Sequence, residues 1–240
     1  MLENYPKTRS ELPPDFQRIY NEHYKNNREG ETTSASLSQK MESWMHKKVA
    51  KDVKKDIKKS TLEIGAGTLN QLKYEKTQPY DIIEPFVELY ANSPYKTHIR
   101  HIYSDIDEIE LSAKYDRIIS IATFEHILDL PKVVAKSVLL LNENGVLRVA
   151  IPNEGTILWE LGWKFTTGLE FKLKYGLNYE TLMKHEHVNT ANEIEKILYF
   201  FFKKHHCSCL DLGKRFAFYR FYECFEPNIE LARKYIGQND

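Results

Sequence analysis

The residues best suited to bind a ligand follow a short apolar segment, residues 61–64, which runs into Gly65-Ala66-Gly67. Glycine allows the chain to bend sharply and lets a ligand lie against bare main chain. A helical pattern over residues 69–74 follows, so unpaired N–H groups at its start would face the same ligand. A Gly-x-Gly turn between a strand and a helix is shared by several nucleotide-binding folds.

A carboxylate stands where such a crevice needs hydrogen-bond acceptors. Glu84 follows the next predicted strand, residues 80–83, and comes 19 positions after Gly65. Its two oxygens lie side by side, which suits the diol of a ribose better than an amide does. A solvated glutamate in a loop is the alternative.

Strand and helix patterns alternate along the middle of the chain. Further strands are predicted over residues 99–103, 115–121 and 146–153, with a helix that starts at residues 129–131. Such strand–helix units favour a parallel sheet covered on both faces. Residues 207–212 and 216–225 are predicted to form two more strands.

Two amphipathic helices flank these units. Both show apolar residues at the three- and four-residue spacings that place them on one face. The first covers residues 37–59 and the second follows Thr190, with the apolar residues Met41, Met45, Val49, Val53 and Ile57 in the first, and Ile194, Ile197, Leu198 and Phe201 in the second.

Residues 62–153 resemble the class I S-adenosylmethionine-dependent methyltransferases in the order and spacing of their motifs. The segment from Leu62 to Gly67 resembles the family's first motif, and Phe124-Glu125-His126 resembles the Leu-Glu-His segment after its fourth strand. The resemblance implies an α/β fold with a Rossmann-like, doubly wound, seven-stranded sheet. That sheet would be mostly parallel with a terminal antiparallel hairpin, accompanied by a helical N-terminal arm and a cap insertion.

The same resemblance implies S-adenosylmethionine as the cofactor. Glu63 would lie near its methionine part, Glu84 would meet the ribose, and Asp105 would meet the adenine amino group. A helix N-cap or turn is the alternative for Asp105. The cofactor-binding residues predicted in this way are Glu63, Gly65, Ala66, Gly67, Glu84, Pro85, Asp105, Ile106, Ser120, Ile121 and, in the arm, Tyr24.

Methyl transfer from a sulfonium donor requires mainly an aligned acceptor. A hydroxyl acceptor must also lose its proton, and a histidine suits that task near neutral pH. We predict His126 or His187 as the general base, with Glu125 orienting a neighbour. A histidine that only ties a loop is the alternative.

The chain is predicted to form a single domain with four parts. Residues 1–59 would form an arm and a helix covering the cofactor, and residues 60–153 the Rossmann-like half. Residues 154–186, rich in aromatic side chains, would form a substrate cap or a small satellite core. Residues 187–240 would supply the final helix and hairpin.

The amino-acid composition limits the kinds of partner and the location expected for the protein. The formal net charge is +0, which disfavours nucleic acid as a partner. Three cysteines suit a reducing cytoplasm, and the apolar run of residues 197–202 is too short to span a membrane. No metal site is predicted, because alternate residues of the segment 205–209 would point to opposite faces of a strand.

These observations lead to one preferred function and two alternatives. The preferred function is methylation of a hydroxyl on a small molecule or a sugar, such as a surface glycan precursor. An NAD-dependent oxidoreductase is disfavoured by Asn70, where the dinucleotide fingerprint has Gly or Ala. A non-catalytic, cofactor-binding partner subunit is the other alternative.

Overall fold

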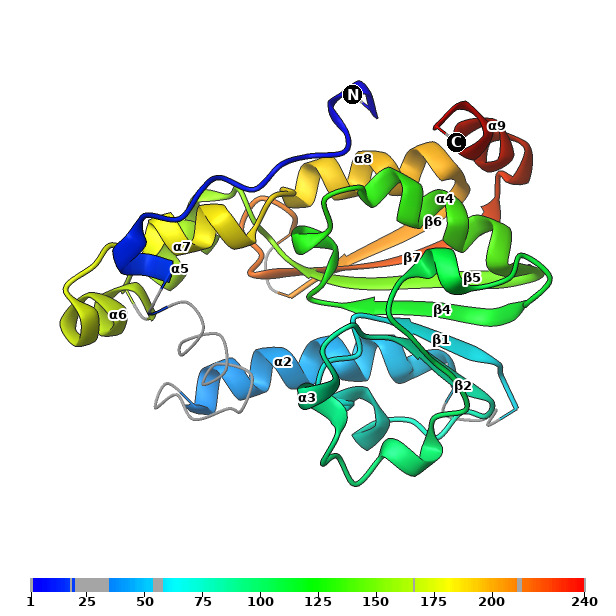
Figure 1. Ribbon diagram of the computed structural model, residues 1–240, viewed down its shortest axis with the longest axis horizontal. Helices are drawn as coiled ribbons and strands as arrows, with labels where there is room; N and C mark the ends of the chain where they lie inside the picture. The colour runs from blue at the N-terminus through cyan, green and yellow to red at the C-terminus, as the bar shows by residue number, and fades with distance from the viewer. Residues whose placement is uncertain are drawn as a thin grey trace.

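A seven-stranded sheet forms the centre of the protein, with helices on both faces (Figure 1). The computed structural model describes residues 2–17, 19, 35–53, 58–165, 167–210 and 213–239. The strand order is β3-β2-β1-β4-β5-β7-β6, and only β7 runs against its neighbours. The predicted fold class, with its terminal antiparallel hairpin, is confirmed.

The bounds of β1, β2 and β4 agree with the sequence prediction, whereas those of β3, β5, β6 and β7 differ from it. Strand β3 has two residues rather than five, and β5 and β6 begin earlier than predicted. The strands are β1 Thr61–Ile64, β2 Tyr80–Ile83, β3 Ile102–Tyr103, β4 Tyr115–Ile121, β5 Leu141–Pro152, β6 Phe202–Cys209 and β7 Tyr219–Pro227.

Three helices cover one face of the sheet, namely α4 (Leu130–Leu140), α8 (Ala191–Phe201) and α9 (Ile229–Asn239) (Figure 1). Helix α2 (Ala35–Val49) lies on the other face against β4, β5 and β7. Apolar side chains on each face form a separate core cluster. The sheet is therefore doubly wound, as predicted.

Helix α8 shows why the local sequence specifies its element. Thr190 and Glu193 form a reciprocal capping box that satisfies N–H groups at the start of the helix. Its predicted apolar stripe is buried, with Ile194, Ile197, Leu198 and Phe201 all at 0% exposure.

The segment after β1 departs from the prediction. In place of a helix over residues 69–74, it forms a single 3₁₀ turn, η3 (Asn70–Lys73). Leu69, at the N-cap, has a φ of 65° and a fully buried side chain. Many class I methyltransferases have glycine at this place, which adopts such a backbone without strain. Here burial of the leucine side chain opposes that strain.

Two buried arginines join the sheet to the end of α2. Arg117 pairs with Glu75 at 2.8 Å and with Asp52 at 3.0 Å, and Arg148 pairs with Asp52 at 3.2 Å and with Glu223. Both guanidinium groups also donate to the Val49 carbonyl, near the end of α2. Cations at a helix C-terminus satisfy its unpaired carbonyl groups. We call Asp52, Glu75, Arg117, Arg148 and Glu223 the arginine network.

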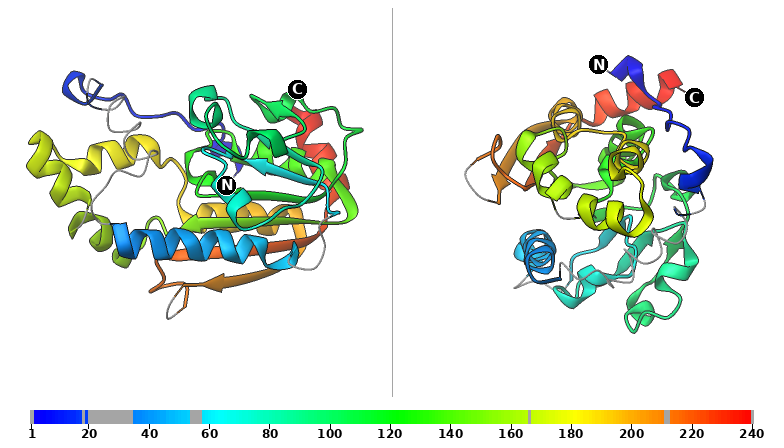
Figure 2. Two further views of the ribbon diagram at one scale, coloured as in Figure 1. Left: turned by 90° about the horizontal axis from the view of Figure 1, so that it is seen from below. Right: turned by 90° about the vertical axis from the view of Figure 1, so that its left-hand side faces the viewer.

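Three further helices lie beyond the carboxyl ends of the parallel strands (Figures 1 and 2). They are α5 (Ile157–Phe165), α6 (Thr167–Tyr175) and α7 (Tyr179–Glu186). Leu12, Phe16 and Ile19 pack with Phe171 and Leu182 in a cluster of their own. Phe171, with Tyr175 and Tyr179 packed beside it, thus belongs to a satellite core, one of the two predicted roles.

Candidate active site

The carboxyl ends of β1, β2, β4 and β5 meet at one edge of the sheet. The glycine turn that follows β1 has positive φ angles, +72° at Gly65 and +52° at Gly67. A Cβ on Gly65 would lie 2.3 Å from the Thr123 side chain, whereas the equivalent position at Gly67 has nothing within 4 Å. Gly65 is therefore required by packing, and Gly67 leaves room beside the main chain for a ligand.

Glu84 faces this turn from the end of β2. It is 4% exposed, and its carboxylate accepts from the Gly67 N–H at 2.7 Å and the Phe86 N–H at 3.1 Å. The adjacent Pro85 is exposed, and Ala66 is buried within the turn. The structure thus brings the predicted ribose acceptor to the glycine turn.

Glu63 lies inside the sheet rather than in the open crevice. It is 2% exposed, and the Tyr80 hydroxyl donates to its carboxylate at 2.8 Å. Burial raises the pKa of Glu63 to about 8 against the hydrogen bond from Tyr80, which lowers it. Its predicted role near the methionine part of the cofactor stays a prediction.

Asp105 and Ile106 follow β3. The Asp105 carboxylate is exposed and accepts from the Asp107 N–H at 2.8 Å, so it caps the 3₁₀ turn η5 (Ile106–Glu108). Ile106 is buried in the core on the α4 face. The structure shows the capping role that was the alternative for Asp105, and contact with adenine remains a prediction for both.

The remaining predicted cofactor residues differ in what the structure says of them. The Ser120 hydroxyl donates to the Ile64 carbonyl at 3.1 Å, which joins β4 to β1. Ile121 is 9% exposed at the end of β4. Tyr24 lies outside the described residues, and so does the part of the arm predicted to close over the cofactor.

The two predicted histidines come together from distant parts of the chain. His126 ends the 3₁₀ turn η6 (Phe124–His126) after β4, and His187 follows α7. Their ring centroids are 4.8 Å apart with an interplanar angle of 81°. The His126 Nδ1 donates to the Glu186 carbonyl at 3.0 Å, and the His187 Nδ1 lies 2.8 Å from a Glu154 carboxylate oxygen.

Glu125 lies beside both imidazoles. Its side chain is 2% exposed, and its Oε1 lies 3.8 Å from the His126 Nε2. Its Oε2 has no hydrogen-bond partner within the described part of the chain. Burial raises the pKa of the Glu125 carboxyl to about 7, while His187 acts in the opposite direction. The role predicted for Glu125, orienting a neighbour of the general base, stays a prediction.

His187 is held by carboxylates. Burial alone would lower its pKa, but the hydrogen bond to Glu154 and the charges of Glu125, Glu154 and Glu186 outweigh burial and raise the pKa. We call Glu125, His126, Glu154 and His187 the histidine cluster.

Several residues that sequence reasoning missed hold this cluster. Glu154 lies two residues after the end of β5 and also accepts from the Trp159 indole N–H. Its position at the carboxyl end of a parallel strand was a usable signal, because ligand sites of open α/β sheets lie there. The sequence analysis assigned it only to the start of the cap.

The N-terminal segment was predicted to form part of an arm that covers the cofactor. Arg9 donates to the carbonyl of His126 at 3.1 Å and to that of His185 at 3.1 Å. The Tyr5 hydroxyl donates at 2.8 Å to Asn189, whose amide in turn donates to the Phe124 carbonyl at 2.9 Å. Residues 5–9 therefore brace the segments that carry the two histidines.

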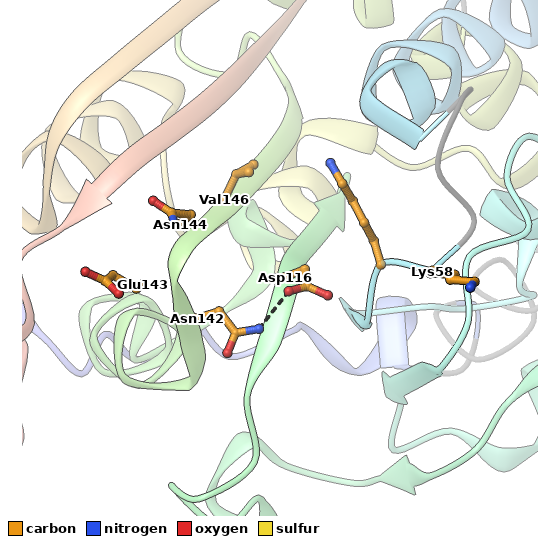
Figure 3. Close-up of a pocket in the computed structure, with 7 residues that line it drawn as sticks. Lys58, Asp116, Asn142, Glu143, Asn144 and Val146 are labelled. Atoms are coloured by element: carbon orange, nitrogen blue, oxygen red, sulfur yellow. Dashed lines mark hydrogen bonds between the residues drawn. The ribbon is translucent and has the colours of Figure 1, made fainter.

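A hollow of about 520 Å³ lies at the other end of the strands (Figure 3). It is lined by residues at the amino ends of β4 and β5 and by Lys58 and Lys59, which precede β1. Asn142 donates to Asp116 there at 2.7 Å. Because ligands of open α/β sheets bind at the carboxyl ends of the strands, we do not assign the cofactor to this hollow.

The fold and the glycine turn together define a Rossmann-like, cofactor-binding protein, with the histidine cluster at the same end of the sheet. A family model described as a methyltransferase domain matches residues 36–212, and the chain belongs to this family. Because the chain belongs to a methyltransferase family, the alternative of an NAD-dependent oxidoreductase is rejected. A comparison with curated proteins gives no match.

Solved structures with the same fold agree with this class. An S-adenosylmethionine-dependent methyltransferase from Thermotoga maritima, described as a possible histamine N-methyltransferase, is 14% identical, with a TM-score of 0.57 over 88% of this chain and 98% of that one. The plantazolicin methyltransferase BpumL, bound to a desmethylplantazolicin analogue and S-adenosylhomocysteine, is 16% identical, with a TM-score of 0.59 over 89% and 91%. The N-methyltransferase NodS from Bradyrhizobium japonicum is 12% identical, with a TM-score of 0.51 over 78% and 97%.

The predicted membership of the class I methyltransferases is therefore confirmed, and S-adenosylmethionine, the predicted cofactor, agrees with the ligands named for these neighbours. Among the described residues, no helix is both long and apolar enough to cross a membrane.

Proposed function

We propose that this methyltransferase transfers the methyl group of S-adenosylmethionine to a hydroxyl oxygen of a small molecule or a sugar. The observation that carries the proposal is the pairing of His126 and His187 beside Glu125 at the carboxyl ends of β4 and β5. A hydroxyl must lose its proton as it attacks, and an imidazole at the acceptor position can take that proton.

Two features of the crevice would hold the cofactor. The glycine turn leaves room beside the main chain at Gly67, and Glu84 offers two oxygens to the ribose diol. The bound cofactor supplies an electrophilic methyl group on a sulfonium. The chain's own contribution is to align the acceptor with that methyl group and to exclude water.

The acceptor would enter from the side of α5, α6 and α7. Trp159 and Tyr219 form an edge-to-face pair with centroids 5.4 Å apart, and Trp159 donates to Glu154 in the histidine cluster. Aromatic faces of this kind suit a sugar ring or another flat small molecule. Through the hydrogen bond from Trp159 to Glu154, an acceptor bound by these helices would be linked to the imidazoles of the histidine cluster.

The test is a methyl-transfer assay with labelled S-adenosylmethionine on matched panels of phenols, sugars and amines. We expect methylated hydroxyl products. His126→Ala and His187→Ala should lower kcat by about 10²–10⁴-fold, while S-adenosylhomocysteine binding stays at the wild-type level.

His185→Ala is the matched control, because His185 lies on α7 but its ring faces the Ser10 carbonyl instead. Its turnover should equal that of the wild type. Methylation of amines alone would overturn the hydroxyl assignment, and undiminished turnover in both histidine variants would overturn the general base. Cofactor binding without turnover on any panel would favour a non-catalytic partner subunit.

A further inference from the structure

We propose that Glu125, His126 and His187 form a binding site for a divalent first-row transition-metal cation. One ligand atom from each residue lies within 4.8 Å of the other two. The three side chains come from two segments that the fold brings together at the crevice, so the grouping is not a consequence of sequence neighbourhood alone. This proposal departs from the sequence analysis, which predicted no metal site.

The imidazoles are oriented as metal ligands usually are. A carbonyl oxygen only accepts, so the His126 ring donates from Nδ1 to Glu186, and His187 likewise presents Nδ1 to the Glu154 carboxylate. A neutral ring that donates from Nδ1 carries its lone pair on Nε2. Metal-bound histidines almost always have such an oxygen partner on the other nitrogen.

Glu125 provides the second observation. Its side chain is 2% exposed, yet its Oε2 has no hydrogen-bond partner within the described part of the chain. A buried carboxylate oxygen without a donor is costly. A cation bound next to the two imidazoles would supply the missing interaction.

The donor set indicates which cations fit. Two imidazoles and one carboxylate suit Zn²⁺, Co²⁺, Mn²⁺ or Fe²⁺, whereas Mg²⁺ and Ca²⁺ prefer sites made of oxygen ligands. Ligand atoms in a tetrahedral site with bonds of about 2.0–2.2 Å lie roughly 3.4 Å apart. Small rotations of the three side chains would close the present separations to that value.

Three protein ligands leave coordination positions open to an acceptor oxygen. If the proposed hydroxyl methylation is correct, a cation here would bind that oxygen and favour loss of its proton to water. In the loaded protein the two imidazoles would then act as ligands, and activation of the hydroxyl would pass to the cation. Only this consequence rests on the proposed function, because binding of the cation does not depend on it.

The test is titration of chelator-treated protein with Co²⁺, followed by calorimetry and by the visible absorption of the bound ion, with Mg²⁺ as a second titrant. We expect one equivalent of Co²⁺ to bind and Mg²⁺ to fail to displace it. Glu125→Gln, His126→Ala and His187→Ala should each lose this binding. Glu154→Gln, which alters the partner of His187 and of Trp159 but none of the three proposed ligands, should weaken it about 10–100-fold.

His185→Ala should bind Co²⁺ like the wild type. Binding of S-adenosylhomocysteine at wild-type affinity shows that each variant is folded, and His126→Gln and His187→Gln replace any alanine variant that is not. Failure of the wild type to bind one equivalent of Co²⁺, or undiminished binding in Glu125→Gln, would overturn the metal site.

The two proposals fail separately, because the Co²⁺ titration contains neither cofactor nor acceptor. A protein that binds Co²⁺ but methylates only amines would keep the metal site and lose the hydroxyl assignment. A protein that binds no Co²⁺ and still methylates a hydroxyl fully after chelation would keep the hydroxyl assignment and lose the metal site.

Discussion

The arginine network and the histidine cluster differ in how their charges are matched. In the arginine network, Arg117 and Arg148 each contact at least one carboxylate within 3.2 Å and donate to the end of α2. In the histidine cluster, carboxylates meet imidazoles, and one oxygen of Glu125 has no hydrogen-bond partner within the described residues.

This difference in charge matching distinguishes a group that stabilises the fold from a group that is available for function. The guanidinium groups of the arginine network pair with carboxylates and donate to the main chain, which fixes the position of α2 against the sheet. Both Asp52 oxygens also lack a hydrogen-bond partner within the described residues, but they lie beside permanent cations, whereas Glu125 has only imidazoles beside it. A buried carboxylate without a permanent cation retains a capacity to bind one, which is typical of functional sites. The following predictions test that contrast, beginning with the largest expected effect.

Removing a cation from the arginine network should be severely destabilising. Arg117→Met leaves the buried Glu75 without its guanidinium partner and Asp52 with Arg148 alone, and an uncompensated buried charge typically costs about 3–5 kcal/mol. The melting temperature in calorimetry should fall by about 10 °C or more.

Lys184→Ala is the comparison variant, since the pair of Lys184 with Glu180 is exposed on α7. Its melting temperature should not change. An equally small change in Arg117→Met would show that the arginine network contributes nothing beyond a surface pair.

Glu63 borders the arginine network and should make stability depend on pH. Its pKa is about 8 in the folded protein and 4.5 as the ordinary value. The protonated form is thus favoured by folding, so its contribution is fully present below pH 4.5 and is lost as pH rises to about 8. Urea unfolding should show Glu63→Gln gaining on the order of 2–4 kcal/mol relative to the wild type between pH 5 and pH 8.

A constant difference between Glu63→Gln and the wild type across this range would mean that Glu63 is ionised throughout. Tyr80→Phe provides a second measure, because it removes the hydrogen bond that Tyr80 donates to Glu63. With that bond gone, the loss of stability with rising pH should become larger.

On the crevice side, Glu84→Gln should weaken cofactor binding. Exchange of the carboxylate for an amide removes charge-assisted hydrogen bonds, worth about 1.5–3 kcal/mol together. Calorimetry should show the Kd for S-adenosylhomocysteine rising about 10–100-fold. The exposed Glu88→Gln on α3 (Val87–Tyr90) should bind as the wild type does.

The smallest effect is expected from Glu125→Gln on stability. Burial raises the pKa of Glu125 to about 7, so its carboxyl is protonated in the folded protein at pH 5. At that pH, Glu125→Gln should change the free energy of unfolding by less than about 1 kcal/mol. Urea unfolding without added metal measures this change. A loss comparable to that of Arg117→Met would show that the histidine cluster is a structural network after all.

Local sequence patterns were sufficient for much of the fold. The bounds of β1, β2 and β4 were predicted correctly, and so was the buried stripe of α8, because strand and helix periodicities depend on neighbouring residues. The turn after β1 was located, but its helix was predicted too long. No local pattern shows that Leu69 adopts a φ of 65° or that Gln71 turns inward to donate to Glu75.

The sequence by itself determined the class of the protein, because the glycine turn, Glu84 and the Phe124-Glu125-His126 segment are short motifs at fixed spacings. Only the tertiary structure decided that His187 lies beside His126, that Glu154 holds it and that Arg9 braces both segments. These contacts join parts of the chain that are far apart in sequence. Their geometry follows from how the cap and the N-terminal segment pack on the sheet, which no local periodicity encodes.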